Sequence, residues 1–210
     1  MTLNRLLVAN RGEIGIRILR AATDLGIETV AVHSQDDAQS LHTKHADQVV
    51  ALSGSGPSAY LDIAEIVAAA ESSGCDALHP GYGFLSENPE LARRCADRGV
   101  LFVGPTVDQL ELFGNKVAAR GAALRSDIPV LPGTEHAASP ADAHEFFDSL
   151  GAGAAVIIKA VAGGGGRGTR AVFQSDEIDA AFAAVPLRGG GGLRERRPVL
   201  GAVRPAGAPY

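Results

Sequence analysis

The chain has 210 residues, of which 46% are hydrophobic, and a formal net charge of −5 at pH 7. This length accommodates one large domain or one and a half small ones, with an apolar share normal for a globular protein. The negative charge argues against nucleic acid as a partner. No apolar stretch approaches the roughly 20 residues that span a bilayer, and the first residues lack a signal-peptide pattern, so we expect no membrane partner.

The chain has two cysteines, Cys75 and Cys95. They show neither CxxC spacing nor a nearby histidine pair, so they do not indicate a metal site. We expect both thiols to be buried and reduced, which is typical of a cytoplasmic protein.

The first half of the chain alternates strand-like and helix-like segments. A strand at 6–9, an amphipathic helix at 13–25 and a strand at 29–32 form a βαβ unit, whose crossover implies parallel strands. The pattern recurs, with strands expected at 48–52, 77–79 and 100–103 and helices at 60–72 and 88–98. The sequence therefore predicts a doubly wound parallel α/β sheet through about residue 105.

A second block with a different pattern follows Gly104-Pro105. Thr106 is expected to cap one helix, and Ser139, followed by Pro140, is expected to cap another. The remaining expected elements are a helix at 116–125, strands at 156–159 and 170–173, and a helix at 175–184. We therefore expect one domain over 1–113 and part of a smaller α+β domain over 114–185.

The last 25 residues, 186–210, have a different composition. They contain six Gly, four Pro, five Arg and one Glu, which gives them a net charge of +4 and leaves −9 for the first 185 residues. Such a composition rarely packs into a core. The glycine run 189–192 has no strand before it and is interpreted as a linker, so we expect 186–210 to lie outside the second domain.

A glycine run after a strand is the strongest sign of ligand binding. The apolar residues 156–158 end in Lys159, and Gly163, Gly164, Gly165 and Gly166 follow. Glycines expose backbone N–H groups with no Cβ in the way, so a polyphosphate can approach beside the lysine cation. The alternative is a flexible hairpin tip or linker. The surrounding Ile-Ile-Lys and Arg-Gly-Thr favour phosphate binding.

The segment 79–88, His-Pro-Gly-Tyr-Gly-Phe-Leu-Ser-Glu-Asn, lies between a strand and a helix. Ligands of open α/β sheets bind beyond the carboxyl ends of the strands, and His79, Tyr82 and Glu87 offer polar groups there. The alternative is a structural turn with Ser86 or Asn88 as helix cap.

The first βα turn gives a weaker signal. Asn10–Gly15 does not match G-x-G-x-x-G, so dinucleotide binding is not expected there. Arg17 and Arg20 share a helix face, which indicates either a solvated surface or a subunit contact. Lys116 begins a helix at the join between the two blocks. With Lys159 it could clamp one nucleotide between two cations from different domains.

Six segments together resemble biotin carboxylase, the ATP-grasp component of acetyl-CoA, propionyl-CoA and pyruvate carboxylases. They are 9–14, 31–34, 79–88, 102–105, 156–159 and 163–168, and the resemblance extends over about residues 3–185. It implies activation of bicarbonate with ATP and Mg²⁺ to carboxyphosphate, followed by carboxylation of biotin on a carrier domain. A carboxyltransferase component and a role in fatty acid metabolism are further implications.

The resemblance also implies roles for individual residues. Lys116 and Lys159 match ATP-binding lysines, and Gly163–Gly166 match the loop that closes over the nucleotide. Tyr82, Gly83 and Glu87 match positions on the biotin side of the cleft. Arg17 and Arg20 match positions used in family dimers. Gly15 stands where alanine is common and Asn115 where aspartate is common, and neither change removes a catalytic group.

In the family, the carboxylate ligands of Mg²⁺, the bicarbonate-binding arginine and the general base belong to later sequence, and Glu195 is the only carboxylate side chain after Val185. We therefore expect no catalytic residues and no metal ligands in this chain, weak nucleotide binding and no turnover. The composition of 186–210 suggests translation out of frame. The alternatives are a non-catalytic nucleotide-binding or dimerising module, and a truncated product without function.

Overall fold

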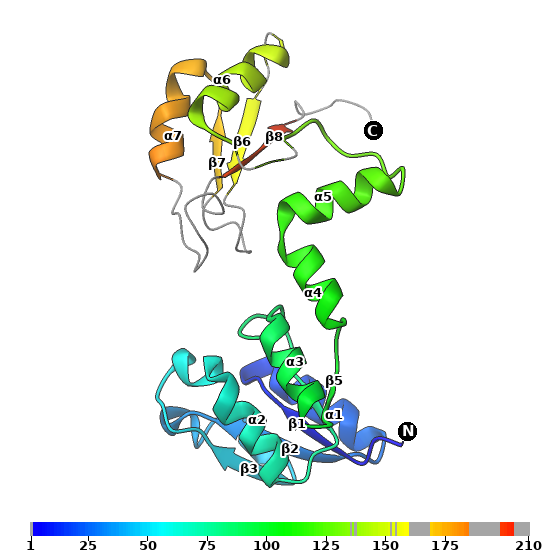
Figure 1. Ribbon diagram of the computed structural model, residues 1–210. Coiled ribbons are helices and arrows are strands. Elements are labelled where there is room, and N and C mark those ends of the chain that lie inside the picture. Colours follow the sequence, from blue (N-terminus) through cyan, green and yellow to red (C-terminus); the bar gives the residue numbers. More distant parts are fainter. Residues whose placement is uncertain are drawn as a thin grey trace. The chain divides into compact units, whose positions relative to one another are not determined.

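The computed structural model describes residues 2–134, 136, 138–151, 153, 155–159, 169–184 and 198–203. These residues belong to two compact units, Met1–Glu111 (unit 1) and Leu112–Tyr210 (unit 2), which are shown in Figure 1. Helix α4 (Val107–Gly114) crosses the boundary between them. The expected loop Gly163–Gly166 lies outside the described residues.

Unit 1 contains the predicted parallel sheet. Its strand order is β3-β2-β1-β4-β5, and every neighbouring pair is parallel. The strands are β1 (Arg5–Val8), β2 (Glu28–His33), β3 (Gln48–Ala51), β4 (Ala77–His79) and β5 (Leu101–Phe102). Each lies within a few residues of its predicted position, because buried parallel strands are short, β-branched runs bounded by turns.

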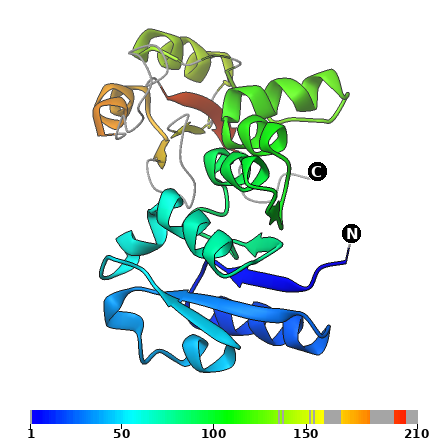
Figure 2. The same ribbon diagram turned by 60° about the horizontal axis from the view of Figure 1, so that its bottom comes forward.

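Alternating side chains divide the core of unit 1 into two layers. On β1, Leu7 packs in the layer of α2 (Ile63–Ser72) and α3 (Pro89–Asp97), whereas Leu6 and Val8 pack in the layer of α1 (Gly12–Asp24). Figure 2 shows α1 on one face of the sheet and α2 on the other. This period of two buries both faces of a central strand. The short 3₁₀ helices Gln35–Asp37 and Leu41–His45 have no counterpart in the predicted elements, whereas Pro57–Leu61 overlaps the start of the helix predicted at 60–72.

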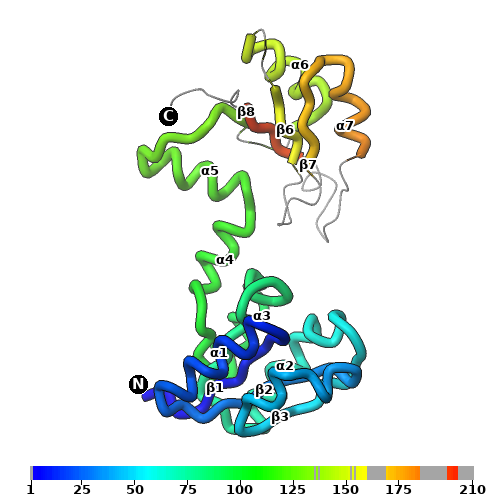
Figure 3. The backbone as a smooth tube through the Cα atoms, turned by 180° about the vertical axis from the view of Figure 1, so that it is seen from behind, coloured from blue at the N-terminus to red at the C-terminus, as the bar shows by residue number. Residues whose placement is uncertain are grey.

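Unit 2 contains a three-stranded antiparallel sheet of order β7-β6-β8. Strands β6 (Ala155–Lys159) and β7 (Thr169–Val172) lie close to their predicted positions. Helix α6 (Pro140–Ser149) begins with a capping box between Ser139 and Asp142. Helices α6 and α7 (Ile178–Ala184) both pack against one side of this sheet, as Figures 1 and 3 show. Helix α5 (Lys116–Arg125) has its predicted bounds.

The expectation that 186–210 stays outside the packed core is wrong for Val199–Val203. These residues form β8, which pairs with β6, and Leu200 is 4% exposed within the core of unit 2. The other edge of β8 bonds to the extended segment 132–134, where Ala202 N–H donates to Pro132 O at 2.9 Å. Five residues rich in valine and leucine suffice for a strand once neighbouring strands supply the hydrogen bonds.

The thiols of Cys75 and Cys95 are buried and unbonded to each other, as expected. Burial raises the pKa of each to about 11, so both remain protonated at neutral pH. Among the described residues, no helix is long and apolar enough to cross a membrane.

One buried histidine makes the stability of unit 1 depend on pH. His42 is 0% exposed; its Nε2 bonds to the carbonyl oxygen of Val32 at 3.1 Å, and its Nδ1 has no hydrogen-bond partner among the described residues. Because a carbonyl only accepts, Nε2 carries the proton of the neutral ring. Burial lowers the pKa of His42 below its usual 6.5, so the unfolded chain binds the proton more readily than the folded chain.

We therefore expect the contribution of His42 to the free energy of unfolding to be constant above about pH 7 and to fall as the pH drops below 6.5, by at most about 1.4 kcal/mol per pH unit. Urea unfolding of the wild type and His42→Gln between pH 7.5 and 5.5 tests this. The variant should show the shallower slope, and His45→Gln, in the same 3₁₀ helix, should keep the wild-type slope. Equal slopes in all three proteins would contradict the assignment.

Candidate functional site

The candidate site of unit 1 lies at the carboxyl edge of the sheet, between β1 and β4. These strands are neighbours, but the chain continues from β1 to β2 on one side and from β4 to β5 on the other. Ligands of open α/β sheets bind at such a reversal, in the crevice beyond the strand ends. The bordering loops are 9–11 after β1 and Pro80–Asn88 after β4.

Asn10 joins these two loops. Its side-chain amide donates to the carbonyl oxygens of Pro80, at 2.7 Å, and Tyr82, at 2.9 Å. Asn10 is 2% exposed; its bond to Pro80 is buried and its bond to Tyr82 is partly buried, so water competes little for the side-chain amide. Gly81 has φ +67°, and a Cβ at this position would lie 2.6 Å from Asn10 Nδ2. Glycine is therefore required at 81 both for the backbone conformation and for the close approach.

His79 fixes the start of the same loop. Its Nδ1 accepts a hydrogen bond from Gly81 N–H at 3.0 Å, so Nδ1 carries no proton and the neutral ring carries its proton on Nε2. Burial lowers the pKa of His79 below its usual 6.5. The ring is therefore neutral at pH 7, and protonation would break the bond that shapes the loop.

The three residues expected on the biotin side all lie exposed on this loop. They are Tyr82, Gly83 and Glu87, and Tyr82 is 64% exposed. Asn88 ends the loop and caps α3, since its side chain accepts two backbone N–H groups of that helix. Of the two candidate caps, Asn88 is thus the correct one. The segment is both a capped turn and an exposed polar surface.

An apolar groove of about 440 Å³ borders this loop. Its wall includes His79, Gly81 and Tyr82, together with apolar side chains of β1 and α1. Of the described residues that line it, Arg17 alone carries a formal charge. The loop therefore adjoins a surface suited to a ligand with an apolar body and a polar end.

Lys159, the expected phosphate-binding residue of unit 2, is the last residue of β6. Val156 and Ile158 of this strand are fully buried against α6 and α7. Because side chains alternate along a strand, Ile157 and Lys159 face the opposite side of the sheet, and both are half-buried. A half-buried lysine beside an apolar side chain is a suitable environment for the phosphate end of a nucleotide.

Lys116 is the first residue of α5, where Asn115 caps the helix by accepting the N–H groups of Val117 and Ala118. Asn115 therefore performs the capping role well, although aspartate is common there in the family. Lys116 and Lys159 both belong to unit 2, so the expectation that they come from different domains is wrong.

Arg17 and Arg20 are exposed on α1. Both line a shallow hollow of about 760 Å³, together with Glu13 and Asp24 of the same helix. Arg20 lies 3.4 Å from the ring of His45, and Arg17 has no ion pair among the described residues. The arrangement fits either interpretation made from the sequence, a solvated face or a subunit contact.

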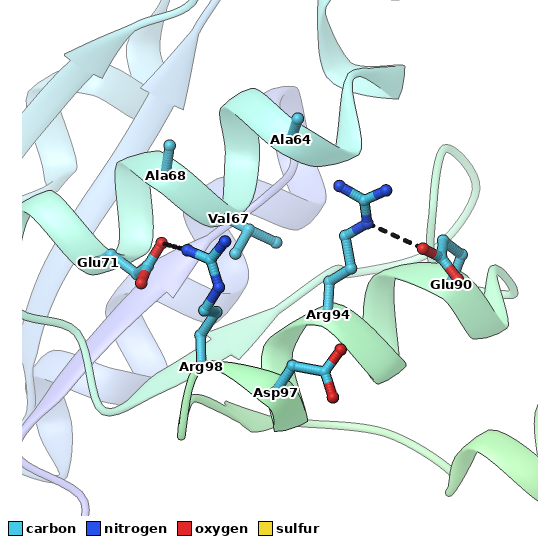
Figure 4. A pocket seen from close by; sticks show the side chains of 8 residues that line it. All are labelled: Ala64, Val67, Ala68, Glu71, Glu90, Arg94, Asp97 and Arg98. Carbon is cyan, nitrogen blue, oxygen red and sulfur yellow. Dashed lines mark hydrogen bonds and ion pairs between the residues drawn. The ribbon is translucent and has the colours of Figure 1, made fainter.

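A further hollow of about 380 Å³ lies between α2 and α3. Figure 4 shows Arg98 paired with Glu71 and Arg94 paired with Glu90, the latter pair at 2.8 Å. Both arginines are already neutralised, and surface pairs of this kind add little stability. We therefore do not include this hollow in the candidate site.

Comparisons with known proteins identify the family. The family model described as "Biotin carboxylase, N-terminal domain" matches residues 2–110. The chain belongs to the biotin carboxylase family. A second model, "Carbamoyl-phosphate synthase L chain, ATP binding domain", matches residues 115–188, so the second part of the chain corresponds to part of an ATP-grasp domain.

Individual relatives agree with this assignment. The chain is 48% identical over 184 residues to pyruvate carboxylase of Staphylococcus aureus and 45% identical over 183 residues to biotin carboxylase of Haemophilus influenzae. Each alignment covers 86% of this chain, but only 16% and 41% of those relatives, respectively. The chain therefore spans less than half the length of these biotin carboxylase relatives.

Solved structures of the family have the same fold. The biotin carboxylase of Campylobacter jejuni, in complex with β,γ-ATP, has a TM-score of 0.87 at 33% identity and covers 95% of this chain and 45% of its own. A second structure is the biotin carboxylase domain dimer of Hydrogenobacter thermophilus 2-oxoglutarate carboxylase, in complex with MgADP, ADP and bicarbonate. Its TM-score is 0.83 at 34% identity, and the match covers 96% of this chain and 44% of that chain. Members of the biotin carboxylase family thus bind adenine nucleotides and bicarbonate.

One group of residues at the carboxyl edge, centred on Asp37, is not indicated by the sequence. Its side-chain partners are Ser34 and Ser40, which are close in sequence, and Arg11 and Tyr60, which come from other segments. No spacing or motif links Arg11 and Tyr60 to Asp37, because these three residues meet only when the sheet forms. The Asp36-Asp37 pair after a strand was the only available signal, and acidic pairs after strands are too common to identify a cluster.

Proposed function

We propose that this chain supplies the phosphate-binding lysine and the biotin-side loop of an ATP-dependent biotin carboxylase. The reaction class joins bicarbonate to the ureido nitrogen of biotin through carboxyphosphate, with a biotin carboxyl carrier and a carboxyltransferase as partner components. The observation that carries the proposal is the combination, in one chain, of the Asn10-tethered loop Pro80–Asn88 and of Lys159 at the end of β6.

The residues of this chain would bind and orient substrates. Lys159, and Lys116 with it, would neutralise phosphate charge, while Tyr82, Gly83 and Glu87 would contact the biotin side. Bound Mg²⁺ would offset the remaining charge of the polyphosphate. The proposal assigns its carboxylate ligands to sequence outside the matched residues, so we expect weak nucleotide binding and no biotin-dependent turnover by this chain alone.

Calorimetric titration with MgATP tests this proposal. We expect saturable binding by the wild type and at least tenfold weaker binding by Lys159→Ala, because a lysine–phosphate contact of about 1.4 kcal/mol or more is lost. Lys116→Ala should also weaken binding. Lys44→Ala, which removes an exposed lysine of unit 1, is the matched control and should bind like the wild type.

Two outcomes would contradict the proposal. One is absence of saturable MgATP binding by the folded wild-type chain. The other is equal affinity of Lys159→Ala and the wild type, which would exclude Lys159 from the phosphate site.

We also propose that the α1 face carrying Arg17 and Arg20 is a contact between two copies of the chain. The observation in its favour is that both arginines are exposed on one hollow, while the Hydrogenobacter domain is a dimer. Sedimentation at rising protein concentration should show a dimer that reversal of both charges, Arg17→Glu with Arg20→Glu, converts to a monomer. A wild-type monomer at all concentrations would exclude the contact.

A further inference from the structure

The carboxylate of Asp37 is the centre of a hydrogen-bond cluster at the carboxyl edge of unit 1. It accepts bonds from Ser40 Oγ at 2.8 Å, Tyr60 OH at 3.0 Å, Ser34 Oγ at 3.3 Å and the guanidinium of Arg11. Partial burial raises the pKa of Asp37, but the bonds from Ser40, Arg11 and Tyr60 outweigh it and lower the pKa overall. Asp37 is therefore ionised and acts only as an acceptor at neutral pH.

Tyr60 connects Asp37 to the loop after β4. Its side chain is fully buried, its hydroxyl donates to Asp37, and its ring stacks on Phe84 with the centroids 5.1 Å apart. The guanidinium of Arg11 lies over the same ring, 5.9 Å from the centroid. Burial, followed by the contact with Asp37, raises the pKa of Tyr60 to about 12, so the hydroxyl keeps its proton.

Phe84 is held in a conformation that it would not adopt alone. Its φ is +42°, one of two positive values among the described non-glycine residues. A bulky residue in this region persists only where its surroundings hold it in place. The ring of Tyr60 lies against Phe84, which follows directly after Tyr82 and Gly83 on the exposed part of the loop.

We propose that Asp37 and Tyr60 are positioning residues that hold the Pro80–Asn88 loop in its ligand-binding shape. The loop is thus fixed from two directions. Asn10 holds the backbone of Pro80 and Tyr82 from the β1 side, and Asp37 holds Phe84 through Tyr60 from the β2 side. That the ligand of this loop is biotin rests on the proposed function, whereas the bracing itself does not.

Hydrogen exchange of the whole chain tests the bracing. The reporters are the Ser86 and Asn88 amides, which bond within the loop at 2.9 and 3.0 Å. Asp37→Asn and Tyr60→Leu should speed their exchange at least tenfold and leave the amides of β2 within twofold of the wild type. Tyr60→Phe keeps the ring and should give a smaller increase than Tyr60→Leu.

The matched control is Asp47→Asn, the same substitution near the opposite end of β2. Asp47 likewise accepts side-chain hydrogen bonds, from Thr29 N–H at 2.8 Å and Thr29 Oγ1 at 2.7 Å, but the bonds described for it do not involve the loop. This variant should leave the loop amides unchanged. Loop exchange that rises equally in Asp37→Asn and Asp47→Asn would overturn the proposal, because the effect would then be general destabilisation.

Binding measurements separate this inference from the proposed function. If biotin is the ligand, Asp37→Asn should weaken biotin binding at least fivefold and leave MgATP binding within twofold. Faster loop exchange in a chain that binds no biotin would support the bracing and contradict the biotin assignment. Unchanged biotin affinity together with unchanged loop exchange would overturn the bracing alone.

Discussion

Gly81→Ala should destabilise unit 1 far more than Gly83→Ala. Both glycines belong to one loop and have nearly equal φ, +67° and +65°, so the strain of a left-handed alanine, about 1–2 kcal/mol, is common to both. Only at 81 would the new Cβ also lie 2.6 Å from Asn10 Nδ2, whereas at 83 it meets nothing within 4 Å. Displacing Asn10 costs its hydrogen bonds to the carbonyl oxygens of Pro80 and Tyr82, one buried and one partly buried, at about 1 kcal/mol each.

We therefore expect losses of about 3–4 kcal/mol for Gly81→Ala and about 1–2 kcal/mol for Gly83→Ala, measured by urea unfolding. A double-mutant cycle gives the mechanism. Asn10→Ala removes the atom that the new methyl group would strike, so the double variant with Gly81→Ala should cost less than the sum of the two single changes. Strict additivity, or equal effects at 81 and 83, would mean that Asn10 does not set the loop conformation.

Leu200→Ala should destabilise unit 2 by about 2–5 kcal/mol, because it removes a large buried side chain and leaves a cavity. Leu200 is 4% exposed on β8 and packs with residues of α6, α7, β6 and β7. Both backbone polar groups of Leu200 are hydrogen-bonded to Thr134. Thr134 N–H donates to Leu200 O at 3.1 Å, and Thr134 Oγ1 accepts from Leu200 N–H at 3.0 Å.

The control for this prediction is Leu131→Ala, the same change at a side chain that is 50% exposed in the segment preceding 132–134. It should alter the free energy of unfolding by no more than about 0.5 kcal/mol. Circular dichroism during urea unfolding gives both values. Similar small effects at both positions would show that β8 is not part of the folded core, and that the compositional interpretation of 186–210 was correct there.

Most of the fold follows from local patterns. The helix at 13–25 has apolar residues at helical spacing, and the structure has α1 at Gly12–Asp24. The strand at 77–79 has its predicted bounds because it is a short run with turn residues on both sides. The helix at 116–125 also has its predicted bounds, and it begins directly after its capping residue, Asn115. Ser139 caps α6 as its position before Pro140 indicates.

Strand β8 could not be predicted in this way. Glycine, proline and arginine dominate its surroundings, and a five-residue run such as Val199–Val203 has no periodicity long enough to outweigh them. Its hydrogen bonds come from β6 and from 132–134, which are about 40 and 65 residues earlier in the chain. Pairing over such separations is a tertiary property that local composition does not reveal.

The candidate site was predictable in part for a related reason. The loop 79–88 is continuous in sequence, so its glycines and polar residues were found as one motif, and Lys159 was found from its strand. The Asp37 cluster is discontinuous, and its bonds to Arg11 and Tyr60 exist only in the folded unit. A single sequence therefore identifies the exposed loop more easily than the residues that hold it in place.

The nucleotide site that we propose for this biotin carboxylase relative lies in unit 2, at the end of β6 that carries Lys159. Hydrogen exchange of the 210-residue chain, with and without MgATP, tests this claim most directly. We predict slower exchange in peptides containing β6 and β7, with no change in β1 to β5 of unit 1. Protection confined to Met1–Glu111, or none anywhere at saturating MgATP, would contradict it.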